Sequence, residues 1–281
     1  MTLSAFPYVG GKTRLADWII DQLPAHTVYA EPFGGSAAVL LNKPRSDIEV
    51  FNDLDGDIVQ FFEVARNHPD ELKQWVRRTP YSEELHAEWV ADFYAGDRPD
   101  DPVARAGRFL FLRYTQYAGK YGGPSGFKCD TPRTRSGDSG VWTSVPDHID
   151  EVCRRLQGVS IQHRHFSEAI EQYDGDETVF YADPPYVGKQ GTYRVDDFSH
   201  AALADALTGI DGYAIASYTD SPEGLYDDWS ELTRAHHHDA GARKHESEKQ
   251  VTERILLNFD PAEVPAFSAP EQATLVETAD D

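Results

Sequence analysis

Apolar and polar residues alternate along the chain with two different periods, and each period predicts one kind of element. Short apolar runs followed by polar or glycine-bearing turns are typical of buried strands. Such runs predict strands at residues 27–30, 48–51, 159–163, 179–182, 213–217 and 255–259. Apolar residues three or four positions apart are typical of helices. They predict helices at residues 15–23, 37–41, 58–64, 71–76, 83–94, 105–117, 200–207 and 222–229, and one more after Phe166.

The order of these elements divides the chain into three parts. Strands and helices alternate over residues 1–55 and again over 160–262, which predicts one discontinuous α/β domain with a doubly wound sheet. Residues 56–159 are mainly amphipathic helix, with a loop-rich stretch at 119–145, and predict a mostly helical insert. The acidic, proline-bearing residues 263–281 predict a flexible tail.

The charge of the chain bears on its partners. There are 48 Asp and Glu residues against 26 Lys and Arg, a formal net charge of −22, whereas a protein that binds phosphates should carry a basic face. Either nucleic acid is not the partner, or the acidic surface keeps the protein hydrated in concentrated salt. Arg outnumbers Lys and Met1 is the single Met, which favours the second alternative, a halophile-type composition.

Basic residues nevertheless gather in the loop-rich stretch, among glycines and aromatic residues. This local excess predicts a hairpin that faces nucleic acid. Its candidate DNA-binding residues are Lys120, Lys128, Arg133 and Arg135.

Several classes of protein are not favoured. We find no apolar run long enough to cross a bilayer and no signal peptide in residues 1–21, which predicts a cytoplasmic protein. Cys129 and Cys153 lack metal-ligand spacing and are too few for a disulfide scaffold, so we expect idle thiols. The run 236–238 is three histidines without a Cys or His partner at ligand spacing. We therefore expect an exposed polar run there and no metal.

A glycine-bearing turn, Glu31–Ser36, follows the first predicted strand. Glycines let the backbone approach a bound ligand closely. Asp53 follows the next strand, roughly 20 residues after the turn, which is the spacing of a ribose-binding acid in a nucleotide-binding βαβ unit. The turn and the acid together favour an adenosine-containing ligand. Gly10–Thr13 looks like the end of a P-loop, but it is not one, because Phe6 occupies the place of the first glycine.

The tetrapeptide Asp183-Pro184-Pro185-Tyr186 follows an apolar strand directly. Open α/β sheets bind ligands at this end of their strands. The side chain of Asp183 and the carbonyl of Pro184 can accept hydrogen bonds from a planar amine and make its nitrogen more nucleophilic, and Tyr186 can stack on a base. Transfer of a methyl group from a sulfonium then requires neither a metal nor a covalent intermediate.

Together these motifs resemble the Dam-like adenine-N6 DNA methyltransferases, the D12 class, in the family's own order from Ala5 to about Phe259. The resemblance implies a Rossmann-like S-adenosylmethionine-dependent fold with an inserted DNA-recognition domain. It also implies methylation of N6 of an adenine flipped out of duplex DNA. The expected catalytic residues are Asp183, Pro184, Pro185 and Tyr186. The expected cofactor-binding residues are Tyr8, Gly10, Lys12, Glu31, Phe33, Gly34, Gly35, Asp53, Phe166 and Asp183, and Tyr193 is a further candidate DNA contact.

The chain departs from the family's pattern at several positions. Tyr8 stands where some members have Trp, and Ala37 replaces a glycine common in the loop. Asparagines typical of the family are missing from 113–119, and Tyr218 stands where Asn is common. These last changes bear on target recognition rather than on the chemistry.

Other functions remain open from sequence. The same pocket chemistry suits cytosine N4, an RNA base or a glutamine amide in protein. A catalytically inactive DNA-binding member of the fold and a nucleotide-binding enzyme of unrelated chemistry are the other classes. We expect a monomer or weak dimer, with a restriction endonuclease as a candidate partner and a halophilic cell or its virus as host. The recognition sequence is not readable, because base readout depends on a few side chains in a groove.

Overall fold

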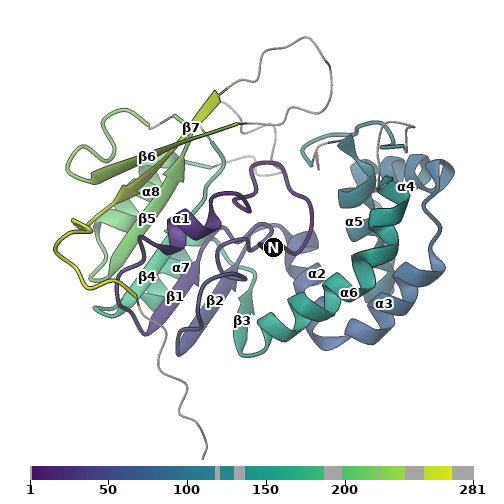
Figure 1. Cartoon of the computed structure of the whole chain (residues 1–281), viewed down its shortest axis with the longest axis horizontal. Helices are drawn as coiled ribbons and strands as arrows, with labels where there is room; N and C mark the ends of the chain where they lie inside the picture. Colours follow the sequence, from purple (N-terminus) through teal and green to yellow (C-terminus); the bar gives the residue numbers. More distant parts are fainter. Residues whose placement is uncertain are drawn as a thin grey trace, which may run out of the picture.

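The computed structural model describes residues 2–117, 121–129, 137–186, 198–220, 222–237 and 250–267. Its centre is a seven-stranded sheet in the order β3-β2-β1-β4-β5-β7-β6 (Figure 1). The strands are β1 (Val28–Glu31), β2 (Ile48–Asn52), β3 (Val159–Gln162), β4 (Thr178–Ala182), β5 (Tyr213–Tyr218), β6 (Ser230–His237) and β7 (Gln250–Leu257). The first five strands pair in parallel, and β7 lies antiparallel between β5 and β6.

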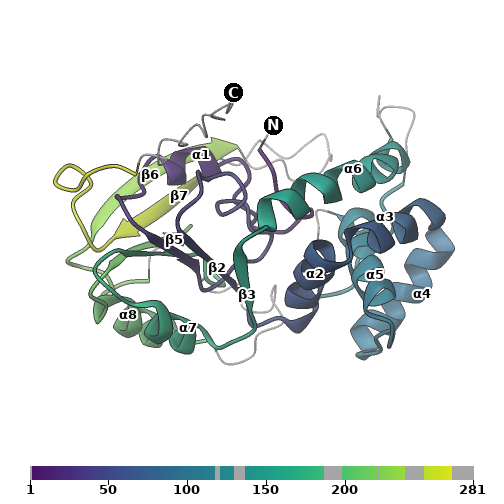
Figure 2. The ribbon, with the colours of Figure 1, turned by 90° about the horizontal axis from the view of Figure 1, so that it is seen from below.

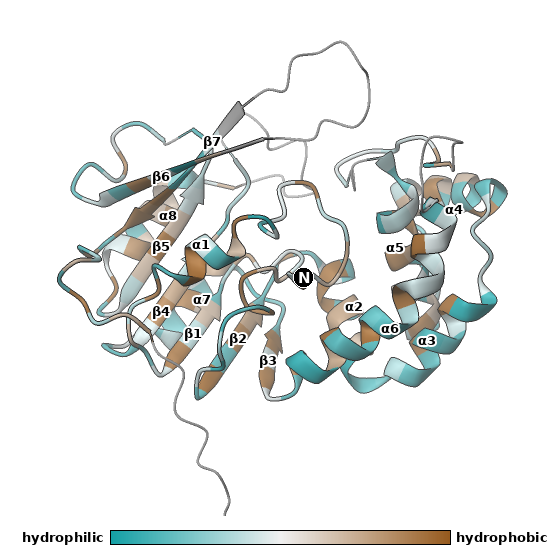
Figure 3. Ribbon diagram, viewed as in Figure 1, coloured by the Kyte–Doolittle hydropathy of each residue, from teal (hydrophilic) through white to brown (hydrophobic). Residues whose placement is uncertain are grey.

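Alternate residues of the strands feed two separate hydrophobic clusters, one on each face of the sheet. On β4, Val179 and Tyr181 belong to one cluster, and Phe180 and Ala182 belong to the other. Figure 2 shows α1 (Ala16–Ile20) on one face, and α7 (Phe166–Tyr173) and α8 (His200–Thr208) on the other. The strands are thus buried on both sides, which is why they read as continuous apolar runs in the sequence (Figure 3).

Five helices between β2 and β3 lie side by side next to the sheet. They are α2 (Gly56–Asn67), α3 (Pro69–Arg78), α4 (Glu83–Ala95), α5 (Pro102–Thr115) and α6 (Asp138–Leu156). Their core is aromatic: Phe109, Phe111 and Trp142 are each at most 3% exposed. Asp57 at the start of α2 accepts hydrogen bonds from Arg98 and Arg105, which ties the loop between α4 and α5, and α5 itself, to α2. The chain between β2 and β3 is therefore a mainly helical segment with its own aromatic core.

Four local expectations were wrong. Residues 37–41 form turns rather than a helix, because Ala37 takes a left-handed φ of +56°. Residues 222–229 also form turns rather than a helix, and β6 follows them where no strand was expected. The second half of the predicted loop-rich stretch is helical, since α6 begins at Asp138 and runs through Pro146. Residues 263–267, expected to be tail, instead pair with the chain after α1, where Phe267 donates its N–H to Leu23; residues 268–281 lie outside the described residues.

In the part of the chain that the structure describes, none of the helices is both long enough and apolar enough to cross a membrane. In the same part, there is no group of three His, Cys, Asp or Glu residues arranged to hold a metal ion.

Candidate active site

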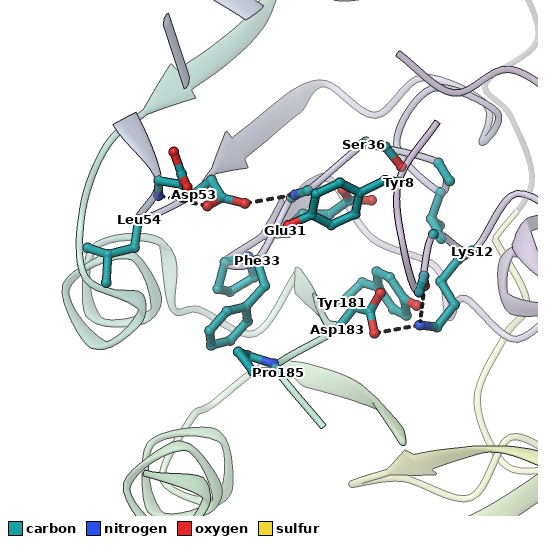
Figure 4. A pocket seen from close by; sticks show the side chains of 18 of the residues that line it. Tyr8, Lys12, Glu31, Phe33, Ser36, Asp53, Leu54, Tyr181, Asp183 and Pro185 are labelled. Atoms are coloured by element: carbon teal, nitrogen blue, oxygen red, sulfur yellow. Dashed lines mark hydrogen bonds and ion pairs between the residues drawn. The ribbon is translucent and has the colours of Figure 1, made fainter. Parts of the chain in front are cut away.

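A cavity of about 380 Å³ lies at the carboxyl ends of β1, β2 and β4. Parallel strands end at this edge of the sheet, and the loops that follow them supply most of its lining. Three separate stretches meet there: the N-terminal loop, the turn after β1, and the residues just after β2 and β4. The lining includes Tyr8, Val9, Gly10, Gly11, Lys12, Glu31, Pro32, Phe33, Gly34, Gly35, Ser36, Asp53, Leu54, Asp55, Tyr121, His165, Phe166, Tyr181, Asp183, Pro185 and Phe198 (Figure 4).

Two glycines bring the turn after β1 against the next strand. A Cβ on Gly34 would lie 2.1 Å from the ring of Phe51, so no side chain fits at that position. Gly35 has a φ of +50°, a left-handed conformation that favours glycine. Its N–H donates to Oδ2 of Asp53 at 2.8 Å. The turn and the carboxylate are therefore one hydrogen-bonded unit.

Asp53 presents a carboxylate to the cavity with both oxygens already anchored. Oδ2 accepts from Gly35, and Oδ1 accepts from the N–H of Asp55 at 2.9 Å. Burial raises the pKa of Asp53 to about 6, and the two backbone donors oppose that rise. Each oxygen keeps a lone pair for a further donor, which suits a pair of vicinal hydroxyls such as those of a ribose.

One end of the cavity is aromatic. The ring of Phe33 lies 5.4 Å from that of Phe166, tilted by 31°, and meets the ring of Phe198 edge-on at 5.6 Å. All three rings line the cavity, and together they form an apolar wall for a flat heterocycle. Thus a purine and its ribose could be bound by adjacent parts of one cavity.

The other end holds a buried ionic cluster. Lys12 is 4% exposed, and its Nζ lies 2.6 Å from Oδ1 of Asp183 and 3.0 Å from the carbonyl of Gly10. The same ammonium contacts the hydroxyl of Tyr186. Burial raises the pKa of Asp183 to about 6, although the nearby positive charge of Lys12 lowers it. Asp183 is therefore mostly ionised at neutral pH and holds its charge beside the cavity.

Glu31 lines the cavity but directs its carboxyl group into the protein. Its Oε1 accepts from the hydroxyl of Tyr29 at 2.8 Å and from the N–H of Leu40 at 2.7 Å. Burial raises the pKa of Glu31 to about 8, so the group is largely protonated at neutral pH. In this arrangement, Glu31 shapes the turn after β1.

A residue from beyond α5 closes one wall of the cavity. Tyr121 is 2% exposed, its ring lies 5.8 Å from that of Tyr8, and its hydroxyl donates to Asp55. The guanidinium of buried Arg113 lies over the same ring, 4.4 Å from its centre. The loop between α5 and α6 thus contributes to the wall of the cavity.

All ten expected cofactor-binding residues line this one cavity. Of the expected catalytic residues, Asp183 and Pro185 line it, whereas Pro184 and Tyr186 are buried behind it. Because the ring of Tyr186 is only 5% exposed, stacking a base on it would require that the ring be uncovered when DNA binds.

Of the five expected DNA-binding residues, the structure describes one, Lys128. Lys128 forms an ion pair with Asp138, with Nζ 2.7 Å from Oδ1, and remains 42% exposed. Lys120, Arg133, Arg135 and Tyr193 lie outside the described residues.

Several site residues were missed from sequence, among them Tyr121, Phe198 and Glu253. Glu253 is 3% exposed on β7, and its Oε1 accepts from the hydroxyl of Tyr186 at 2.6 Å. The sequence pattern of β7 could have indicated the burial of Glu253, because side chains alternate between the two faces of a strand and Glu253 shares its face with the buried Ile255 and Leu257. Tyr121 lies in an irregular loop, so no periodicity indicated its burial.

The fold is that of the Rossmann-like S-adenosylmethionine-dependent methyltransferases, in which an antiparallel last strand is inserted into a parallel sheet. The chain belongs to the D12 class N6 adenine-specific DNA methyltransferases, whose family model matches residues 8–230. It is therefore an enzyme that methylates N6 of adenine in DNA, and its net charge of −22 does not exclude a DNA substrate.

Similar proteins come from archaea and bacteria. The chain is 27% identical to the Type II methyltransferase M.MjaIII of Methanocaldococcus jannaschii in an alignment of 197 residues that covers 64% of this chain and 67% of that protein. It is 26% identical to the DNA adenine methylase of Escherichia coli K12 in an alignment of 215 residues that covers 72% of this chain and 74% of that protein. With the DNA adenine methylase of Salmonella typhi, the identity is 24% over 242 residues, covering 82% and 84%.

Proposed function

We propose that the cavity binds S-adenosylmethionine and that the methyl group passes to N6 of an adenine flipped out of duplex DNA beside Asp183. The observation that carries this proposal is the position of Asp183, which lines the same cavity as Gly35 and Asp53. An acceptor for the amine and a binding site for an adenosyl group are thus adjacent.

The residues present fit this cofactor. The aromatic wall of Phe33, Phe166 and Phe198 would hold the adenine ring, and Asp53 would accept from the ribose hydroxyls. The close contact of Gly34 with Phe51 leaves no room for a side chain at this position, so that the backbone there can lie against the ligand. The carboxylate of Asp183 supplies negative charge at the end where a sulfonium would be stabilised.

The chemistry needs only orientation and charge from the protein. The bound cofactor supplies a methyl group on a positively charged sulfur. Asp183 and the carbonyl of Pro184 accept hydrogen bonds from the two N–H groups of the amine, which directs the nitrogen lone pair at the methyl carbon. As the N–C bond forms, the electrons of the C–S bond stay on sulfur, and the amine loses one proton. Asp183, with its pKa of about 6, is suited to accept that proton and pass it to solvent.

We further propose that residues 56–159 act as the DNA-recognition insert, joined to the catalytic parts 1–55 and 160–262. Support comes from the position of α2–α6 next to the sheet (Figure 1) and from Tyr121, which extends from the insert into the cavity wall. Lys120, Lys128, Arg133 and Arg135 remain the candidate DNA contacts of this insert, and Tyr193 is a further candidate DNA contact. Base flipping is required because N6 is not accessible to this cavity while the adenine is stacked in the duplex.

The test is to express the chain in cells that lack adenine methylation and to sequence their DNA with detection of modified bases. We expect N6-methyladenine at one short sequence motif in cells that carry the gene, and none in cells that carry the Asp183→Ala variant. Methylation at cytosine N4, or labelled methyl groups only in RNA or protein, would contradict the proposal. The motif found would also supply a defined duplex for the experiments below.

A further inference from the structure

Glu253 contacts the transfer site from a strand far away in the sequence. It lies on β7, 67 residues from Tyr186, whose hydroxyl donates to Oε1 at 2.6 Å. The same oxygen is 3.5 Å from Nζ of Lys12. Both Glu253 and Lys12 are 4% exposed at their side chains, so these contacts are shielded from water.

The charges of this cluster do not balance. Among the described residues, the carboxylates of Asp183 and Glu253 share the ammonium of Lys12, at 2.6 and 3.5 Å. These three described side chains, two negative and one positive, together carry a net negative charge beside Asp183. Had Glu253 been neutral, Lys12 would compensate more of the charge of Asp183 and weaken it as a hydrogen-bond acceptor.

A purely structural role explains this residue poorly. The inward neighbours of Glu253 on β7, Ile255 and Leu257, are aliphatic, and the cost of burying a carboxylate beside them is offset only by the hydrogen bond from Tyr186 and the charge of Lys12. An aliphatic residue at this position would fill the same side of the strand at lower cost. What an aliphatic residue could not do is accept from the Tyr186 hydroxyl and compete for Lys12.

We propose that Glu253 is a positioning residue for methyl transfer: it fixes the hydroxyl of Tyr186 and shares Lys12 with Asp183, so that Asp183 keeps its capacity to accept from the substrate amine. The inference rests on the proposed function of Asp183 and extends it to a residue outside the recognisable motifs. Glu253 touches neither substrate nor cofactor in this account; it acts through Tyr186 and Lys12.

The test uses Glu253→Gln in the full chain, with Glu231→Gln as the matched control. Glu231 lies on the neighbouring strand in an exposed pair with Arg254, at 2.6 Å, so its change removes the same charge from the same sheet edge outside the site. On duplex DNA with the methylated motif, we expect the single-turnover rate of Glu253→Gln to fall about 10- to 100-fold. Glu231→Gln should keep the wild-type rate.

A second readout separates positioning from simple loss of structure. The negative charge of Glu253 raises the pKa of Asp183, so Glu253→Gln should lower that pKa and move the acidic limb of the pH–rate profile to lower pH. The other titratable groups that interact with Asp183 are unchanged: Lys12, Glu31, Tyr181, Tyr186 and Tyr218. The carboxyl carbon of Asp183, followed by NMR in cofactor-free protein and assigned with Asp183→Asn, should report the same shift without turnover.

The outcomes are distinct. If wild-type protein methylates adenine and Glu253→Gln does so at the same rate with an unmoved acidic limb, the inference is overturned. If Glu253→Gln does not fold, Tyr186→Phe removes the other partner of the same hydrogen bond and must itself slow the single-turnover rate; an unchanged rate in Tyr186→Phe would overturn the inference equally. If wild-type protein transfers no methyl to adenine, the proposed function has failed instead.

Discussion

The backbone N–H of Gly35 donates to the carboxylate of Asp53 at 2.8 Å, which joins the turn after β1 to the acid after β2. A Cβ on Gly35 would lie 3.3 Å from the ring of Tyr8, and the φ of +50° strains any other residue. Gly35→Ala should therefore displace both the ring and the hydrogen bond. We expect the affinity for S-adenosylmethionine to fall about tenfold or more, equivalent to at least ~1.4 kcal/mol, as measured by calorimetry.

The control for this prediction is Gly96→Ala. Gly96 ends α4 with a φ of +94°, and no atom lies within 4 Å of its added Cβ. Both variants should lose about 1–2 kcal/mol of unfolding free energy from backbone strain, but only Gly35→Ala should lose cofactor affinity. Equal affinities in the two variants would show that the turn does not contact the cofactor.

Tyr121→Phe tests whether the insert shapes the cofactor site. The variant keeps the ring against Tyr8 but removes the hydroxyl that donates to Asp55, whose N–H in turn anchors Asp53. We expect cofactor affinity to fall about 3- to 10-fold, as for the loss of one hydrogen bond to a charged group. Tyr117→Phe is the control, because Tyr117 is 53% exposed and precedes the same loop. A Tyr121→Phe protein with wild-type affinity would refute the coupling.

Glu31→Gln should be tolerated, because burial already raises the pKa of Glu31 to about 8 and leaves the group neutral at pH 7. Its folded pKa exceeds its ordinary value of 4.5, so the folded state holds the proton more tightly. This contribution to stability is full below about pH 4.5 and is lost as the pH rises through about 8. Urea unfolding of wild type minus Glu31→Gln should show that decline; a difference independent of pH would argue that Glu31 is ionised.

High salt should stabilise this protein. With a net charge of −22, repulsion among surface carboxylates opposes folding, and about 1 M salt screens it to a range of roughly 3 Å. We expect the urea midpoint to rise between about 0.1 and 1 M KCl, and the single-turnover rate with saturating DNA to rise with it. A midpoint that falls or stays constant would contradict the halophile-type interpretation of the composition.

The local motifs were readable because their chemistry depends on neighbours in sequence. The apolar run before Asp183 forms β4, and the spacing from Gly34 to Asp53 places both at one cavity. The predictions failed where the residue types of a segment favour a different element from the one that forms. Residues 37–41 are apolar like a helix, yet Ala37 adopts a left-handed turn, and α6 contains Gly140 and Pro146, which are typical of loops.

Contacts between residues far apart in the sequence could not be predicted from the local pattern of apolar and polar residues. Glu253 meets Lys12 because β7 inserts between β5 and β6, a pairing that no spacing in the sequence announces. Tyr121 reaches Asp55 across 66 residues for the same kind of reason. The motifs thus specified the chemistry, and the topology specified which groups surround it.

Methyl transfer by purified Asp183→Ala tests the role of Asp183 most directly. Folding is checked by urea unfolding against wild type, and labelled S-adenosylmethionine is supplied with duplex DNA. We predict a folded protein that forms no N6-methyladenine above background in a single turnover. A folded Asp183→Ala protein that methylates adenine at the wild-type rate would contradict the central claim.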